Sequence, residues 1–404
     1  MRKTRPPVAP FTPTAPDGAP DARRLAAPAK GRGTATRLAH RFTSWQREAE
    51  DDGWAPLAPQ ARVVSTDGDG DNDSRDDDAW ASRSAVPGRT QVVAEQARSI
   101  LSRNDSPDIP FKWAINPYRG CEHGCIYCYA RPTHSYLNLS PGLDFETRLV
   151  AKANAAELLA RELARPGYVC SPINIGSATD AYQPVEREWG LTRGVLSVLD
   201  SCRHPFTIVT KSAGVERDLD LLAAAAARQQ TYVMVSLTTL DPALARILEP
   251  RAAAPHRRLQ AVRRLHAAGV PVGVNVAPII PFLNEPEIEH LIDAAAEAGA
   301  QAIHYTVVRL PWEVRPLFEE WLQHHVPERA GRIMARIHDL QGGQAYDARF
   351  GQRMKGQGLW ADLIRQRVRK AAARHGLGHS GPALDTSRFD PGLLQPPPAQ
   401  GSLF

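Results

Sequence analysis

The chain has 404 residues, of which 43% are hydrophobic and 23% are charged, so it is long enough to bury the core of one or two globular domains. The formal net charge of +5 permits contact with nucleic acid or an acidic partner, but it is small for this length. No run of about 18 uncharged apolar residues occurs, and no apolar segment follows the basic N-terminus. We therefore expect no membrane span, no signal peptide and a cytoplasmic location.

Residues 1–90 are rich in Pro, Ala, Gly, Arg and Asp without a sustained hydrophobic period, so we expect a mostly disordered N-terminal arm. The acidic run from Asp67 to Asp78 lacks the Gly at its sixth position and the Glu at its twelfth that a calcium loop needs, and we expect no calcium site there. Residues 30–34 and 41–45 combine glycines with aromatic side chains. We expect these two stretches to dock as a short ordered arm.

Residues 91–315 alternate short β-branched runs with longer helical patterns, which predicts a parallel sheet covered by helices. The predicted strands are residues 113–117, 173–176, 206–210, 232–237, 270–276 and 303–308. The predicted helices between them are residues 146–164, 192–202, 218–227, 255–268 and 285–298, with Asn284 as the N-cap of the last.

The rest of the chain predicts a C-terminal helical extension over residues 316–378, with helices at 317–325, 329–339 and 359–374, and a disordered tail over residues 379–404. Six strand and helix units are fewer than the eight of a closed barrel. The predicted fold class is therefore α/β, a partial (β/α)6 barrel of the TIM type with disordered N- and C-terminal extensions. Its active site is expected at the carboxyl ends of the strands.

Three cysteines, Cys121, Cys125 and Cys128, directly follow the first predicted strand, separated by three and then two residues. Three thiolates can hold three irons of a 4Fe-4S cluster and leave the fourth iron open, whereas a structural zinc ion normally takes four protein ligands. The alternative is a zinc loop with a distant fourth ligand such as His123 or His134.

The cysteine spacing, with Tyr127 immediately before the third cysteine, resembles the signature of the radical S-adenosylmethionine (radical SAM) family. The resemblance implies that the open iron of a 4Fe-4S cluster binds S-adenosyl-L-methionine, which is cleaved reductively to a 5'-deoxyadenosyl radical. It also implies a low-potential electron donor, such as flavodoxin or ferredoxin, as a partner. Tyr127 and Tyr129 are expected to pack on the adenine of the cofactor.

Within this family, residues 112–310 resemble the spore photoproduct lyases and their DNA repair photolyase-like relatives. The similar segments are residues 176–180, 209–211, 235–237 and 276–279, which follow or end the second to fifth predicted strands. Carrying the family's cofactor contacts across these segments implicates Thr179, Lys211, Ser236 and Ala277.

One position departs from the pattern of the lyases, in which a cysteine of the second-strand segment donates a hydrogen atom to the product radical. Ser177 stands at the matching position, and its O–H bond is too strong for that task. The isolated Cys170 and Cys202 are expected to be buried thiols away from the strand ends. We therefore do not expect photoproduct repair, and the substrate stays unknown.

Nucleic acid is a possible substrate or partner, because Arg257, Arg258, Arg263 and Arg264 form a basic cluster near the expected cofactor end of the fold. The alternative function is a nucleic-acid-binding, partner-binding or redox-sensing protein that keeps the cluster without radical catalysis.

Overall fold

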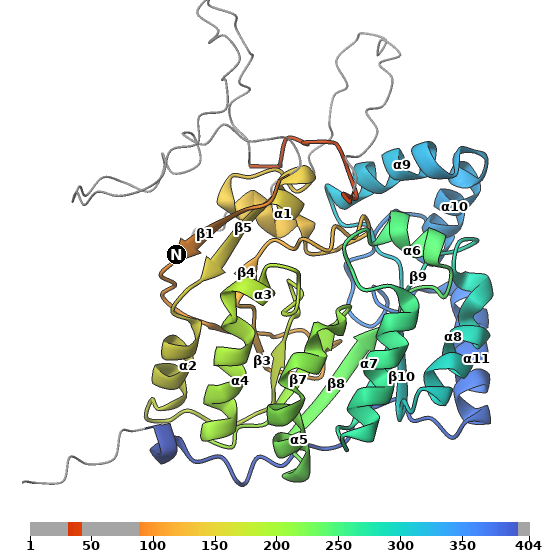
Figure 1. The fold of residues 1–404 in the computed structure, drawn as a ribbon. Helices are drawn as coiled ribbons and strands as arrows, with labels where there is room; N and C mark the ends of the chain where they lie inside the picture. The colour runs from red at the N-terminus through yellow and green to blue at the C-terminus, as the bar shows by residue number, and fades with distance from the viewer. Residues whose placement is uncertain (1–30, 43–88, 395–404) are drawn as a thin grey trace, which may run out of the picture.

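A computed structural model of the protein describes residues 31–42 and 89–394, and its centre is a seven-stranded sheet with the order β10-β9-β8-β7-β6-β3-β2 (Figure 1). Six strands run parallel and β2 pairs antiparallel with β3. The strands are β2 Leu101–Arg103, β3 Trp113–Ile115, β6 Ile173–Ile175, β7 Phe206–Thr210, β8 Thr231–Ser236, β9 Val272–Ile279 and β10 Ala302–Val307. The six predicted strands are confirmed, and the open order, with β10 and β2 at opposite edges, confirms a partial barrel.

Helices connect the parallel strands and cover the outer face of the sheet (Figure 1). They are α2 Ala155–Leu163, α3 Glu186–Trp189, α4 Leu191–Ser201, α5 Leu219–Ala227, α6 Pro242–Leu248, α7 Pro255–Ala267 and α8 Ile288–Glu297. Three more helices follow β10: α9 Val314–His325, α10 Pro327–Leu340 and α11 Gly358–Arg374. The core lies between sheet and helices, where strand residues such as Ile208, Val233 and Val274 are fully buried.

The helix predicted over residues 146–164 is wrong in its first part. Helix α1, Leu143–Thr147, is followed by strand β5, Arg148–Lys152, which lies between β1, Gln91–Glu95, and β4, Tyr118–Arg119, in a second small sheet. Leu149 and Ala151 of β5 are fully buried in an apolar cluster with Tyr118. Pairing with a strand more than fifty residues away overrides the local helical pattern.

The N-cap predicted at Asn284 is confirmed in position, because Asn284 immediately precedes the first helical turn, but its side chain does not cap that turn. A 3-10 turn, Glu285–Glu287, precedes α8, and no side-chain hydrogen bond from Asn284 caps either element. The Asn284 amide instead accepts from the Ile280 backbone N–H at 2.6 Å and donates to the Thr238 carbonyl at 2.6 Å. It thus joins the ends of β8 and β9.

Residues 31–42 lie across one end of the molecule between α1 and α9 (Figure 1). The Leu143 N–H donates to the Thr36 carbonyl at 2.9 Å, and the Thr36 hydroxyl donates to Glu320 of α9 at 2.5 Å. Arg41 forms an ion pair with Glu313 at 3.0 Å. The predicted docking is confirmed for these residues, whereas Lys30, residues 43–45 and the acidic run at 67–78 lie outside the described residues.

Residues 379–394 are packed against the domain rather than following the predicted disordered tail. They run along the end of the sheet opposite the arm and reach α4 (Figure 1). The Asp385 N–H donates to the Gln229 carbonyl at 2.8 Å, and the Asp390 N–H donates to the Cys202 carbonyl at 3.0 Å. Phe389 packs edge-on against His204 with 4.9 Å between ring centroids. Residues 395–404 lie outside the described residues.

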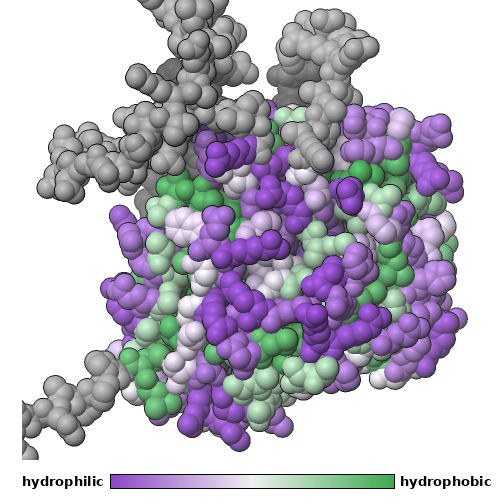
Figure 2. Space-filling model, viewed as in Figure 1, coloured by the Kyte–Doolittle hydropathy of each residue, from purple (hydrophilic) through white to green (hydrophobic). Residues whose placement is uncertain are grey.

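The surface on the face seen in Figure 1 is mainly hydrophilic, with apolar residues in small separate groups (Figure 2). Among the described helices, none combines the length and the apolar character needed to cross a bilayer.

Candidate functional site

The loop that carries the three cysteines lies against the segments that follow β6 and β8. The His123 carbonyl accepts from the Arg251 N–H at 3.2 Å, and the Ile126 N–H donates to the Leu248 carbonyl at 3.1 Å. Gly120 and Gly124 adopt φ of 77° and 66°, the left-handed region that favours glycine in tight turns. The loop is therefore fixed at the carboxyl ends of the parallel strands, as predicted.

A fully buried ion pair between Arg131 and Glu146, 2.5 Å long, holds this loop in shape. The Arg131 guanidinium also donates to the carbonyls of Gly124 at 3.2 Å and Cys125 at 2.9 Å. Glu146 in turn accepts from the backbone N–H of Gly33 at 2.9 Å. The N-terminal arm is thus part of the support beneath the cysteines. The sequence prediction missed this pair, because only the fold brings the arm, the loop and α1 together.

The three cysteine thiols differ in burial. Cys121 and Cys125 are buried and Cys128 is partly exposed. Burial, the Asp180 carboxylate and the other two thiols raise the pKa of Cys121, and burial and Glu249 raise the pKa of Cys125. These thiols therefore favour the thiolate form only when a metal centre compensates the charge.

Among the described residues, no three His, Cys, Asp or Glu side chains converge on a point where one metal ion could bind. A 4Fe-4S cluster does not require such convergence, because each cysteine binds a different iron. His134 Nε2 is 2.8 Å from the Arg148 carbonyl, and His123 Nδ1 lies 3.4 Å from Asp180. The zinc alternative with either histidine as fourth ligand gains no support from this geometry.

Asp180 and Asn116 tie the loops after β3, β6 and β7 together. Asp180 accepts from the Thr210 hydroxyl and from the backbone N–H of Lys211, both at 2.7 Å. The Asn116 side chain accepts from the Ala178 N–H at 2.8 Å and donates to the Ser177 hydroxyl at 3.2 Å. These bonds give the strand-end loops one defined arrangement beside the cysteines.

Glu249 lies near the cysteine loop and contacts two cationic side chains, those of Arg258 and Lys211. It pairs with the buried Arg258 guanidinium, lies 3.7 Å from Lys211 Nζ and accepts from the hydroxyls of Tyr127 and Thr238. Burial by itself would raise the pKa of this carboxyl, but Arg258 and Lys211 outweigh burial and hold the pKa at about 2. Glu249 is therefore ionised throughout the neutral range.

The predicted cofactor residues Thr179 and Lys211 follow the neighbouring strands β6 and β7, and Ala277 lies near the end of β9. Lys211 Nζ is 3.5 Å from the Ala277 carbonyl. The Thr179 hydroxyl is buried and has no hydrogen-bond partner among the described residues. Ser236 ends β8, and its carbonyl accepts from Arg258 at 3.2 Å.

The two predicted adenine contacts, Tyr127 and Tyr129, lie in different environments. Tyr127 is 7% exposed, packs with Cys125 and Ile126, and bonds Glu249 through its hydroxyl. Tyr129 is 47% exposed, its hydroxyl donates to the Ser177 carbonyl, and the Arg309 guanidinium lies 4.2 Å from its ring centroid. Only Tyr129 presents an open ring face to a ligand.

The basic cluster predicted to contact nucleic acid is largely neutralised within the fold. Arg258 is 1% exposed and pairs with Glu249, so its assignment to a nucleic-acid contact is wrong. Arg257 pairs with Glu216 at 3.5 Å, and Arg264 pairs with the same carboxylate. One of these guanidinium groups is buried and two others share one carboxylate, and a cluster of arginines in the sequence does not predict either feature.

Comparison with known proteins identifies the same region of the chain. Residues 115–295, which include the three cysteines and the strand-end loops, match the model of the Radical SAM superfamily. An uncharacterised protein of Mycobacterium tuberculosis is 38% identical over 226 residues, or 55% of this chain and 66% of that relative. An uncharacterised protein of Methanocaldococcus jannaschii is 28% identical over 242 residues, or 59% of this chain and 85% of the relative.

The fold is similar to that of a solved spore photoproduct lyase, complexed with dinucleoside spore photoproduct. The TM-score is 0.52 at 16% sequence identity, over 74% of this chain and 87% of the lyase. At this identity the similarity applies to the fold alone.

Proposed function

Because residues 115–295 belong to the radical SAM superfamily, we propose that this protein is an enzyme that binds a 4Fe-4S cluster through Cys121, Cys125 and Cys128 and cleaves S-adenosylmethionine. The observation that carries the proposal is the position of the three cysteines beside Thr179 and Lys211 at the carboxyl ends of the strands. When bound and reduced, the cluster supplies one electron to the sulfonium of the cofactor, which yields methionine and a 5'-deoxyadenosyl radical.

The residues of this chain bind and orient the two groups. Lys211 carries a positive charge that can neutralise the cofactor carboxylate. The ion pair between Lys211 and Glu249, with 3.7 Å between the Nζ and Oε1 atoms, fixes the position of this charge. The unpartnered Thr179 hydroxyl is available to a polar group of the cofactor, and the exposed ring of Tyr129 is available to its adenine. Arg131 keeps the cysteine loop in place through the carbonyls of Gly124 and Cys125.

Anaerobic reconstitution with iron and sulfide, followed by reduction with dithionite, tests the proposal. We expect 5'-deoxyadenosine to form only when S-adenosylmethionine is present, and Cys125→Ala to remove both this product and the broad absorbance at roughly 400 nm of the cluster. Cys170→Ala and Cys202→Ala are matched controls that should keep both signals. A well-formed cluster that yields no 5'-deoxyadenosine contradicts catalysis, and an equal need for Cys202 contradicts the three-cysteine site.

A second candidate function, binding of nucleic acid without radical catalysis, is favoured by an exposed aromatic rim near the arm. The rim comprises Phe42, Tyr136 and Trp312, which are 52%, 70% and 61% exposed. The Arg41 guanidinium lies 4.7, 5.7 and 4.4 Å from their ring centroids. Exposed rings around a cation suit the stacking of unpaired bases. Trp312 also adopts φ of 46°, an uncommon conformation for a bulky residue that is often found at functional positions.

Fluorescence anisotropy with a labelled single-stranded oligonucleotide tests this candidate. Trp312→Asn removes the ring, while asparagine tolerates the left-handed backbone, so we expect weaker binding without loss of fold. Leu393→Asn, at another exposed apolar side chain, is the control. If both variants bind as the parent does, the aromatic rim does not contact nucleic acid. If binding persists in a protein that makes no 5'-deoxyadenosine, the second function replaces the first.

A further inference from the structure

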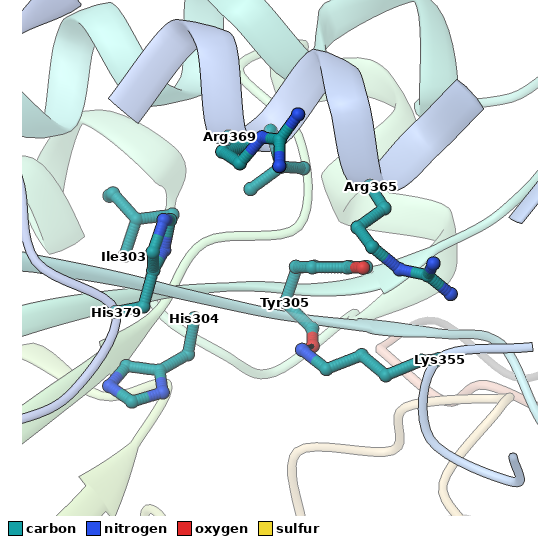
Figure 3. Close-up of a pocket in the computed structure, with 8 residues that line it drawn as sticks. Ile303, His304, Tyr305, Lys355, Arg365, Arg369 and His379 are labelled. Carbon is teal, nitrogen blue, oxygen red and sulfur yellow. Dashed lines mark hydrogen bonds between the residues drawn. The ribbon is translucent and has the colours of Figure 1, made fainter. Parts of the chain in front are cut away.

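A cavity of about 240 Å³ lies between the edge strand β10 and helix α11 (Figure 3). We call it the basic cavity, and its lining residues are Ile303, His304, Tyr305, Lys355, Arg365, Val368, Arg369 and His379. Strand β10, the segment before α11, α11 itself and the segment after it each contribute to the wall. Five of these eight residues carry basic side chains, and none carries a carboxylate.

Little in the surroundings compensates this charge. Arg365 pairs with Asp362 at 2.8 Å, but both side chains are more than half exposed, and such surface pairs contribute little. Arg369 forms no ion pair with any residue that the structure describes. Lys355 donates to the Tyr305 carbonyl at 2.8 Å and lies 3.6 Å from the Tyr305 ring centroid, so its charge has no anionic partner there either.

The inner part of the cavity is also poorly solvated. Burial, followed by repulsion from Arg365, lowers the pKa of Lys355 to about 8. Burial, Lys355 and His379 together lower the pKa of His304. The Nε2 atom of His304 is buried and lacks a hydrogen-bond partner among the described residues. A bound anion would offset the mutual repulsion of these groups and accept hydrogen bonds from them.

We propose that the basic cavity binds the phosphate group of a small phosphorylated molecule. The volume corresponds to about eight water molecules at roughly 30 Å³ each, enough for a phosphate and part of the group attached to it. In Figure 3, Arg365 and Arg369 extend from α11, and the Lys355 amine lies at the Tyr305 carbonyl below them, so cationic groups from two segments are offered to an oxyanion with several acceptor oxygens. Val368 and Ile303 supply an apolar wall for the attached group.

Isothermal titration calorimetry of the full chain tests the proposal, with inorganic phosphate and adenosine monophosphate as separate ligands in a chloride buffer. We expect saturable binding of phosphate that Arg369→Ala weakens by roughly tenfold or more, because a charge-assisted contact is lost. Lys370→Ala is the matched control, since Lys370 is exposed, adjacent in sequence and absent from the cavity wall. We expect this control to bind phosphate within a factor of about two of the parent protein.

The two ligands separate the possible sources of the phosphate. Tighter binding of adenosine monophosphate than of phosphate, lost in Arg369→Ala, assigns the cavity to a phosphorylated organic molecule. Equal binding of the two ligands, also lost in Arg369→Ala, assigns it to the free ion and overturns the role of the apolar wall. Absence of saturable binding, or equal weakening by Lys370→Ala, overturns the site altogether. Arg365→Ala repeats the test if Arg369→Ala proves misfolded by circular dichroism.

Discussion

Glu249 and Arg258 form a buried ion pair whose side chains are each about 1–2% exposed. A buried cation without a partner lowers the free energy of unfolding by far more than a surface ion pair raises it, because water cannot reach the buried charge to replace the missing partner. Lys211 and the Tyr127 hydroxyl depend on the same carboxylate. The pair therefore stabilises both the fold and the position of the lysine expected to bind the cofactor.

Glu249→Gln is expected to lower the free energy of unfolding by about 3–5 kcal/mol, because Arg258 loses the carboxylate with which it pairs among the described residues. Urea denaturation monitored by circular dichroism measures the loss. Glu319→Gln is the control: it breaks an exposed pair with Arg315 and should cost less than about 1 kcal/mol. An equal decrease in the free energy of unfolding of the two variants would show that the buried pair stabilises this fold no more than the exposed pair does.

His204 is a buried histidine that makes stability dependent on pH. Burial lowers its pKa from 6.5 to about 4, and its ring nitrogens contact the Pro205 carbonyl at 2.9 Å and the Tyr168 hydroxyl at 2.8 Å. The unfolded chain therefore takes up a proton at a higher pH than the folded chain does. The stabilisation that the neutral ring provides is complete above pH 6.5 and is lost progressively as the pH falls towards 4.

His204→Asn is expected to reduce the fall in melting temperature between pH 6.5 and pH 4.5, since this uptake of a proton on unfolding is removed. His134 shows the same lowered pKa of about 4, so part of the fall should remain. Differential scanning fluorimetry over this range measures the slope. The exposed His256 supplies the control, and an unchanged slope in His204→Asn, like that of His256→Asn, contradicts the prediction.

At the scale of elements, the arm of residues 31–42 and the cysteine loop are in close contact. A Cβ atom added at Gly33 would lie 2.0 Å from the Gly124 carbonyl oxygen, so only glycine allows the arm to approach this closely. The Gly33 N–H bond to Glu146 depends on that approach, and Glu146 in turn holds Arg131. The arm thus acts on the shape of the loop between Cys121 and Cys125.

Gly33→Ala is expected to displace the arm and lower the iron content after reconstitution at least severalfold, while most of the fold is kept. Iron per protein and tryptic cleavage after Arg37 and Arg41 measure the two effects. Gly331→Ala in α10 is the control, because nothing lies within 4 Å of its added Cβ. The role of the arm is wrong if Gly33→Ala takes up as much iron as Gly331→Ala and is cleaved no faster.

The elements that could be predicted from the sequence are those fixed by local pattern. Strands β6 to β10 are short apolar runs between helical patterns, and the predicted bounds differ from the observed ones by three residues or fewer. The strands β1, β4 and β5 were missed, because their stability comes from pairing with one another across the chain. The cysteines were found because three ligands on one loop form a local pattern. Glu249 pairs with Arg258 nine residues later, and Arg131 pairs with Glu146 fifteen residues later, but neither spacing follows the period of a helix or strand, so the sequence pattern does not reveal these pairs.

At the scale of the whole molecule, the two isolated cysteines lie at the end of the sheet opposite the cysteine loop. Cys202 ends α4 and is fully buried, and its carbonyl accepts from the C-terminal segment at Asp390. Cys170 precedes β6, whereas Ser177 follows this strand. The strand therefore separates Cys170 from Ser177 by roughly 10 Å, at about 3.3 Å per residue. The predicted distance of Cys170 and Cys202 from the carboxyl ends of the strands is confirmed, whereas the predicted burial is confirmed for Cys202 and wrong for Cys170, which is partly exposed. Among the described residues, the thiols near the proposed radical site are those of Cys121, Cys125 and Cys128, which we propose as cluster ligands.

The final prediction concerns the photoproduct lyases, whose fold this chain shares. A thymine-based product radical needs a nearby S–H group as hydrogen donor, and transfer from the Ser177 hydroxyl would be strongly uphill because its O–H bond is stronger. We expect the reconstituted protein to form 5'-deoxyadenosine but not to convert dinucleoside spore photoproduct efficiently to two thymidines, as measured by liquid chromatography. Ser177→Cys, whose side chain lies beside Asn116, is the matched variant and should raise any thymine yield. Efficient conversion by the parent protein that survives loss of both Cys170 and Cys202 would show that the argument from Ser177 is mistaken.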